Sequence, residues 1–177
     1  TVCCNYAYSG TRLSGFMDSD PFNVAWRAAL DELAVNRGAN RRHILYIGFG
    51  TNDGPSTPST WLAMMETCIA DRKAAGWDDI VIQTIPSRTD AGFWGGAAGT
   101  GNTNYAAPIN AILRDTAPGN WASVNGVYIA DIAAHAEIGP WDLIGNVLAT
   151  PSQNATHFYD TVHPTRATVE IALPTIQ

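Results

Sequence analysis

Short apolar runs that end at polar or glycine-rich turns dominate the hydrophobic pattern of the chain. The clearest run is 43–49, which stops abruptly at Gly50-Thr51-Asn52-Asp53-Gly54. Apolar runs of this length are typical of strands buried on both faces of a parallel sheet. Similar runs at 79–86 and 126–132, and a shorter one at 2–8, predict three further strands.

The first predicted helix follows the strand at 2–8. Asp20 can cap this helix and Pro21 suits its first position, while Gly38 suits a left-handed stop near its end. Between them an apolar stripe recurs at helical spacing, which predicts one buried face. The stripe comprises Phe22, Trp26, Ala29, Leu30 and Leu33.

Three more helices follow the same periodicity. Ser59 or Thr60 is expected to cap the second helix, which ends near Gly76. The third spans 104–116, and the fourth begins near Pro164. The residues at turn spacing are Trp61, Leu62, Met65, Cys68, Ile69 and Arg72 in the second helix, and Ile109, Ile112 and Leu113 are expected to face inward in the third.

Strands that alternate with helices predict an α/β fold with a mostly parallel sheet covered on both faces. The 177 residues, 46% of them hydrophobic, suit one core, so we predict a single domain over 1–177. Residues 11–20 are expected to form a loop, as are residues 87–102. A polar run as long as 87–102 is usually functional or disordered, and its Phe93 and Trp94 favour an ordered loop that faces substrate.

Charge and hydropathy argue against two kinds of partner. The net charge is -6 and the ten lysine and arginine residues are scattered, which argues against nucleic acid. The longest apolar runs fall far below the roughly 18 to 20 residues of a membrane span. The sequence does not identify the compartment. Cys3, Cys4 and Cys68 are predicted to be buried thiols, with a disulfide or metal ligation as alternatives.

Two side chains near the C-terminal end suit proton transfer. Asp160 and His163 lie three residues apart, so the carboxylate can accept a hydrogen bond from one ring nitrogen. This bond would leave the other nitrogen as a general base. A metal site formed by His157, Asp160 and His163 remains an alternative, although the six-residue spacing of the two histidines suits a loop poorly.

Two candidate hydrogen-bond donors follow predicted strands. Asn52 carries an amide and Gly10 offers a main-chain N–H, and both groups can stabilise an oxyanion. Because the carboxyl ends of parallel strands meet at one edge, we expect these donors to converge with Asp160 and His163. Asn52 as a plain turn residue is the alternative, and Asp53 is expected to cap the turn or tie loops together.

These motifs resemble those of the SGNH or GDSL hydrolases. Gly50-Thr51-Asn52-Asp53 is similar to the third sequence block of that family, and Asp160-Thr161-Val162-His163-Pro164 is similar to its fifth. The residues that lead to Gly10 resemble the second block more weakly. The resemblance implies a three-layer α/β/α flavodoxin-like fold that hydrolyses esters, and no cofactor is expected.

The resemblance also implies a role for each matched residue. His163 would be the base, Asp160 its orienting partner, and Gly10 and Asn52 two of the oxyanion donors. Arg12 and Trp94, in the two predicted loops, are candidate substrate-binding residues.

The nucleophile of the family has no counterpart in these residues. Its Gly-Asp-Ser block should end the first strand, but Ser19 precedes a helix and is interpreted as a cap, and Ser9 follows the wrong strand. In the family's strand order, 2-1-3-4-5, the missing strand lies between 2–8 and 43–49, and its absence would leave backbone groups unpaired. We therefore expect a separate N-terminal fragment, another chain or another part of the parent protein to supply the serine.

The expected reaction is hydrolysis of small acyl esters, most readily O-acetyl groups on a carbohydrate, through an acyl-enzyme. Trp94 and Trp141, both in predicted loops, favour a carbohydrate mildly. A lipase, lysophospholipase or thioesterase on the same fold is one alternative. A non-catalytic carbohydrate-binding or assembly module is another.

Overall fold

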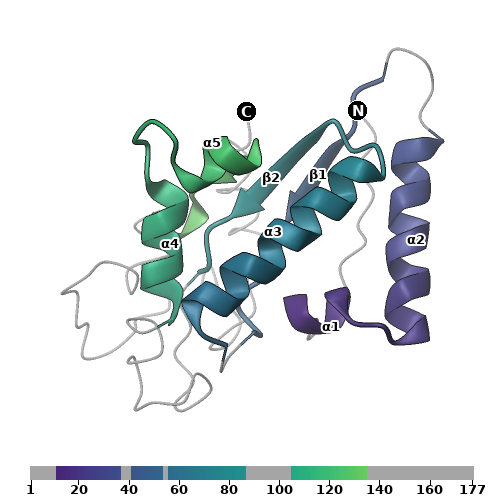
Figure 1. The fold of residues 1–177 in the computed structure, drawn as a ribbon, viewed down its shortest axis with the longest axis horizontal. Coiled ribbons are helices and arrows are strands. Elements are labelled where there is room, and N and C mark those ends of the chain that lie inside the picture. Colours follow the sequence, from purple (N-terminus) through teal and green to yellow (C-terminus); the bar gives the residue numbers. More distant parts are fainter. Residues whose placement is uncertain (1–10, 37–40, 54–55, 87–104, 135–177) are drawn as a thin grey trace, which may run out of the picture.

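A parallel three-stranded sheet lies at the centre of the computed structural model (Figure 1). The structure describes residues 11–36, 41–53, 56–86 and 105–134. The strands β1 (Ile44–Ile47), β2 (Asp79–Gln83) and β3 (Tyr128–Ala130) are adjacent in that order, and each neighbouring pair is parallel. The predicted α/β class and three of the predicted strands are therefore confirmed, and the arrangement is compatible with a flavodoxin-like fold.

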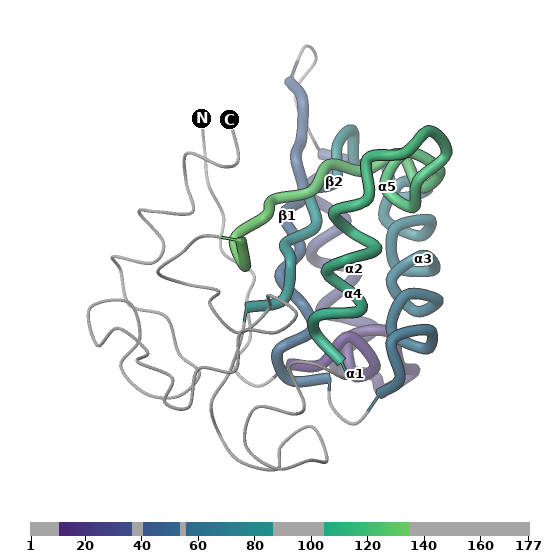
Figure 2. The backbone as a smooth tube through the Cα atoms, turned by 90° about the vertical axis from the view of Figure 1, so that its left-hand side faces the viewer, coloured from purple at the N-terminus to yellow at the C-terminus, as the bar shows by residue number. Residues whose placement is uncertain are grey.

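The five described α-helices lie on the same side of this sheet (Figure 2). The second helical layer expected for a three-layer fold is not among the described residues. The helices are α1 (Leu13–Met17), α2 (Pro21–Val35), α3 (Pro58–Ala74), α4 (Ala107–Arg114) and α5 (Trp121–Asn125), and a short 3-10 turn, η2 (Ile132–Ala134), follows β3.

The two faces of the sheet differ in exposure. Toward the helices, β1 and β2 bury Leu45, Ile47, Ile80 and Ile82. On the opposite face Ile44 of β1 is 58% exposed and Tyr128 of β3 is 60% exposed. The prediction that 43–49 is buried on both faces is therefore wrong for β1. Its burial alternates because β1 lies at the edge of the described sheet and only one face meets described helices.

Helix α3 contributes more buried residues than any other described helix. All six residues predicted at turn spacing on it are buried, including Trp61, Met65 and Cys68, each with 0% exposure. The buried thiol of Cys68 confirms that prediction. The cap differs from the prediction. Thr57, and not Ser59 or Thr60, caps the helix, and its Oγ1 accepts a hydrogen bond from the Thr60 N–H at 3.2 Å.

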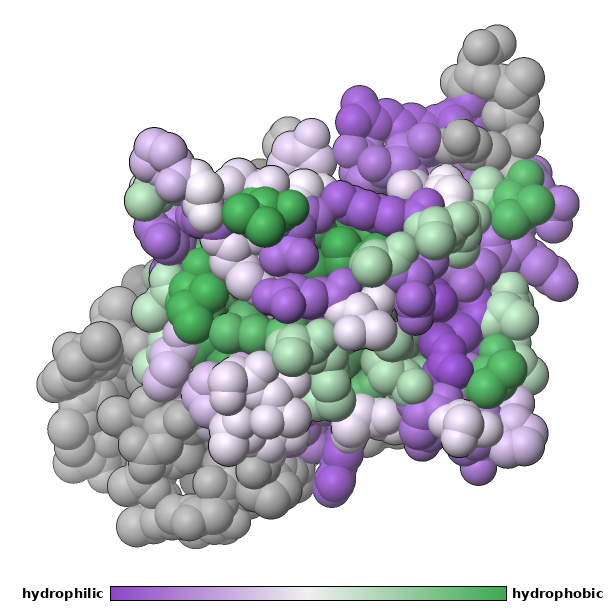
Figure 3. All heavy atoms as spheres, in the orientation of Figure 1, coloured by the Kyte–Doolittle hydropathy of each residue, from purple (hydrophilic) through white to green (hydrophobic). Residues whose placement is uncertain are grey.

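Helix α2 begins as predicted, but its buried face differs. The Asp20 carboxylate accepts a hydrogen bond from the Phe22 N–H at 2.9 Å, so Asp20, not Ser19, is the cap. Phe22 of the predicted stripe is 55% exposed, and the buried positions are Leu30 and Ala34. On the side viewed in Figure 3, exposed hydrophobic side chains of α2 lie at one end and those of α4 and α5 at the other, with polar residues among them.

Other predictions fail or fall outside the described residues. Residues 11–20 contain helix α1 rather than only a loop, α5 was not predicted, and Ile112 is 38% exposed instead of facing inward. Within the described ranges, no helix is both long and apolar enough to cross a membrane. The expected strand at 2–8, the loop at 87–102, the helix near Pro164, and Cys3 and Cys4 all lie outside the described residues.

Candidate active site

Residues 50–53 form a turn that follows β1 at the carboxyl edge of the sheet, called here the Asn52 turn. The Asp53 N–H donates to the Gly50 carbonyl at 3.1 Å and closes this turn. Gly50 has a φ of +123°, and a Cβ placed on it would lie 2.5 Å from two side-chain carbons of Ile85, beyond the end of β2. Only glycine fits here without strain, because both the backbone conformation and the space exclude a side chain. This explains why the motif requires Gly50 two residues before Asn52.

Asp53 joins the Asn52 turn to helix α1. Its Oδ1 accepts hydrogen bonds from the Leu13 N–H at 2.6 Å and from the Ser14 N–H at 3.4 Å. These donors belong to the first turn of α1, whose N-cap residue, Arg12, makes no side-chain capping bond. The carboxylate of Asp53 thus caps a helix that lies 40 residues earlier in the chain. Asp53 was predicted to cap the turn or tie loops together, and it does tie two segments, one of which is a helix rather than a loop.

The carboxyl group of Asp53 is buried away from solvent. The residue is 2% exposed, and its Oδ2 accepts no hydrogen bond from the part of the chain that the structure describes. Burial raises the pKa of Asp53, while the N–H groups of Ser14 and Leu13 act to lower it. The buried hydroxyl of Tyr105 has a raised pKa because of its burial and of the nearby Asp53 charge. This arrangement holds a carboxyl group in place and leaves it little access to solvent.

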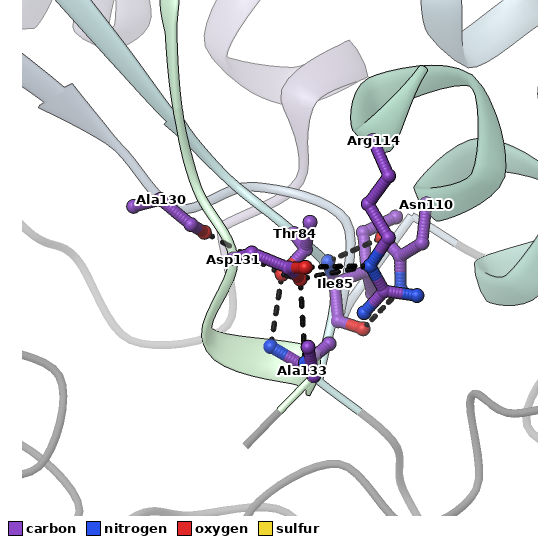
Figure 4. Close-up of polar contacts among 8 residues, drawn as sticks. Thr84, Ile85, Asn110, Arg114, Ala130, Asp131 and Ala133 are labelled. Carbon is purple, nitrogen blue, oxygen red and sulfur yellow. Dashed lines mark hydrogen bonds and ion pairs between the residues drawn. The ribbon is translucent and has the colours of Figure 1, made fainter. Parts of the chain in front are cut away.

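A second polar cluster holds the carboxyl ends of β2 and β3 (Figure 4). The Asp131 carboxylate accepts from Arg114 Nε, at 2.9 Å on Oδ1 and 2.8 Å on Oδ2, and from the Thr84 hydroxyl at 3.1 Å. Thr84 Oγ1 in turn accepts from the Ala133 N–H at 2.9 Å. These bonds fix α4 and the turn after β3 to the same sheet edge as Asn52.

Asn110 of α4 completes this cluster. Its side-chain amide accepts from the Ile85 N–H at 2.8 Å and donates to the Ile85 carbonyl at 2.9 Å. Sequence reasoning missed this cluster. The available signals were the four-residue spacing of Asn110 and Arg114 on one helix and an acidic residue at the end of a predicted strand.

The structure describes two of the six predicted site residues. Asn52 is half-buried in its turn and Arg12 is exposed at the start of α1, and the Asp53 bond brings their two segments together. Gly10, Trp94, Asp160 and His163 lie outside the described residues. The expected convergence of His163 with Asn52 therefore stays a prediction.

At the level of chemistry, the described edge offers one amide side chain beside a rigid backbone turn. A half-buried amide of this kind can donate to an oxygen that gains charge during a reaction. Comparisons of this chain with protein-family models, with curated proteins and with solved structures gave no match.

Proposed function

We propose that this protein is a carboxylic ester hydrolase of the SGNH type that removes small acyl groups, above all O-acetyl groups from a carbohydrate. The supporting observation is the Asn52 turn. It follows β1 at the carboxyl edge of a parallel sheet, where such sheets bind ligands. Its shape depends on Gly50, and Asp53 fastens it to the segment that follows Gly10.

The proposed reaction uses a serine from a polypeptide segment outside these 177 residues. His163 takes the proton of the serine hydroxyl while the serine oxygen attacks the acyl carbon, and Asp160 holds the imidazole. Asn52 and the Gly10 N–H donate to the oxyanion of the tetrahedral intermediate. His163 then protonates the leaving alcohol, and water, deprotonated by His163, releases the acid and restores the serine.

The test is hydrolysis of a chromogenic acetyl ester by the complete parent protein. The His163→Ala variant should lose at least about a thousandfold in kcat/KM, because a general base of a catalytic triad contributes more than that. His43→Ala is the matched control, because His43 precedes β1 and therefore lies at the amino edge of the sheet, opposite the edge where Asn52 lies. Its ring is 6.1 Å from that of Trp77. Full activity of the His163→Ala variant would exclude the mechanism.

The same assay distinguishes the alternatives. Faster hydrolysis of long-chain than of acetyl esters would identify a lipase or thioesterase. No hydrolysis of any ester by the parent protein would favour the non-catalytic module.

A further inference from the structure

One hydrogen bond connects the two segments that carry the proposed oxyanion donors. Asp53 Oδ1 accepts from the Leu13 N–H at 2.6 Å, across 40 residues of sequence. Asn52 directly precedes Asp53, and Gly10 precedes Leu13 by only three residues. The Asn52 turn and the segment that follows Gly10 are therefore joined by a residue that is neither of the two proposed donors.

The contacts of Asp53 suit it to bind main-chain N–H groups and not to react with a substrate. One carboxylate oxygen is occupied by the Leu13 and Ser14 N–H groups. The other is buried, in a residue with 2% exposure. Trp61 of α3 and Tyr105, just before α4, also interact with Asp53. A substrate has no open approach to either oxygen through these described residues.

We propose that Asp53 is a positioning residue that keeps the first turn of α1 fixed against the Asn52 turn, so that donors on both segments reach the same oxyanion. This inference rests on the proposed function. The geometry of an oxyanion site is demanding, and a displacement of about 1 Å can cost about a hundredfold in rate. A short, buried hydrogen bond between the two segments limits that displacement.

The experiment compares Asp53→Ala and Asp53→Asn in the complete parent protein. Asparagine keeps an oxygen that can accept from the Leu13 N–H, whereas alanine removes it. Asn120→Ala is the matched control, because Asn120 caps α5, another five-residue helix, through a 2.7 Å bond from the Ser123 N–H. Both alanine variants remove a short side chain that caps a short helix, but only Asp53 lies beside Asn52.

Two measurements are made on each variant. The first is kcat and KM for a chromogenic acetyl ester, and the second is hydrogen exchange of the amides in residues 11–17. Asp53→Ala should lower kcat about 10- to 100-fold with KM within about twofold, since the lost geometry matters mainly in the transition state. Asp53→Asn should keep kcat within about threefold of the wild-type value, and Asn120→Ala should leave kcat unchanged.

A double substitution separates positioning from a general loss of stability. In an Asn52→Ala background one proposed donor is already gone, so Asp53→Ala should lower kcat by less than about threefold. An equal loss in both backgrounds, or an equal loss in Asp53→Ala and Asn120→Ala, would overturn the proposal.

Hydrogen exchange distinguishes failure of this inference from failure of the proposed function. Asp53→Ala should expose the Leu13 and Ser14 amides, while Asn120→Ala should not. If the wild-type protein hydrolyses no ester, the function fails, yet selective loss of protection would still support the contact that Asp53 makes. Unchanged protection in Asp53→Ala overturns the inference whatever the activity.

Discussion

Gly50 shows how one residue position determines the shape of the candidate site. Its backbone has a φ of +123°, a region that side chains disfavour, and Ile85 occupies the space where a Cβ would project. Gly15 in α1 is a useful contrast, because nothing lies within 4 Å of a Cβ placed there and its φ is not positive. The two glycines therefore differ in whether the fold requires them.

Replacing these glycines by alanine should have opposite effects. Gly50→Ala should lower the free energy of unfolding by about 1 to 3 kcal/mol, from backbone strain and the clash with Ile85. Gly15→Ala should raise it by about 0.4 to 1 kcal/mol, because alanine restricts the unfolded chain and favours helix. Urea unfolding followed by circular dichroism measures both. Equal effects of the two substitutions would contradict the requirement for glycine at position 50.

At the scale of elements, α2 and α3 are joined by a partly buried ion pair. Arg72 of α3 lies 3.1 Å from the Asp31 carboxylate of α2, and the side chain of Arg72 is 7% exposed. The indole N–H of Trp77 also donates to Asp31 at 3.2 Å. The guanidinium group of Arg72 lies 5.8 Å from the ring centre of Phe16, so that α1 contacts the same pair. Removal of one charge would leave the other poorly compensated.

The Arg72→Met variant should lose about 3 kcal/mol of unfolding free energy. This value is at the lower end of the range for a buried pair, because Asp31 keeps 20% of its side chain exposed. Adding Asp31→Asn, which removes the unpaired charge, should recover at least about half of that loss. Thermal and urea unfolding test this, with Arg41→Met at an exposed position as a control expected to stay within about 0.5 kcal/mol. A double variant less stable than Arg72→Met would show that the charge is not the cause.

At the scale of the whole molecule, two carboxyl groups of the described residues have raised pKa values, one half-buried and one buried. Burial is the main cause for both Asp31 and Asp53. The folded protein therefore holds more protons at these sites than the unfolded chain does, over a pH window that begins near the ordinary value of 3.8. As the pH rises through this window, the two groups must ionise where burial has removed part of their hydration, and stability falls.

This effect appears as a pH-dependent difference between the wild-type protein and an asparagine variant. The unfolding free energy of the wild type, relative to that of Asp53→Asn or Asp31→Asn, should decrease as the pH rises above about 3.8. Carboxyl groups such as Asp18, which are present in both proteins, cancel in this difference. Urea unfolding at a series of pH values provides the measurement, and a difference that rises with pH would contradict the raised pKa values.

The sequence predicted those parts of the molecule whose stability comes from local pattern. The buried residues of α3 follow directly from helical spacing, and Asp20-Pro21 marks the start of α2 because capping is a local interaction. Helix α1 escaped prediction because its five residues show no periodicity of their own and its cap comes from Asp53, 40 residues away. Helix α5 carried local signals, the Asn120 cap and the left-handed Gly126, but residues 117–125 were given no element and Gly126 was assigned to the start of a strand.

The candidate site was predicted only in part for the same reason. The Gly50-x-Asn52-Asp53 motif indicated a turn and a tying role for Asp53, but the partner of Asp53 could not be derived from spacing. Contacts such as those of Asn110 with Ile85 join segments that only the fold brings together. The pattern of burial on β1 was also missed, because it depends on which layers cover the sheet and not on the strand's own sequence.

The paired bonds of Asn110 have a consequence for the main chain just beyond β2. A buried peptide group without partners costs about 1 to 3 kcal/mol for each unsatisfied donor or acceptor. The side-chain amide of Asn110 imitates a peptide unit and satisfies both polar groups of Ile85 from within the same molecule. Ile85 and Asn110 are both 0% exposed, so an apolar residue at position 110 would strand a donor and an acceptor of the main chain where water cannot replace the lost partner.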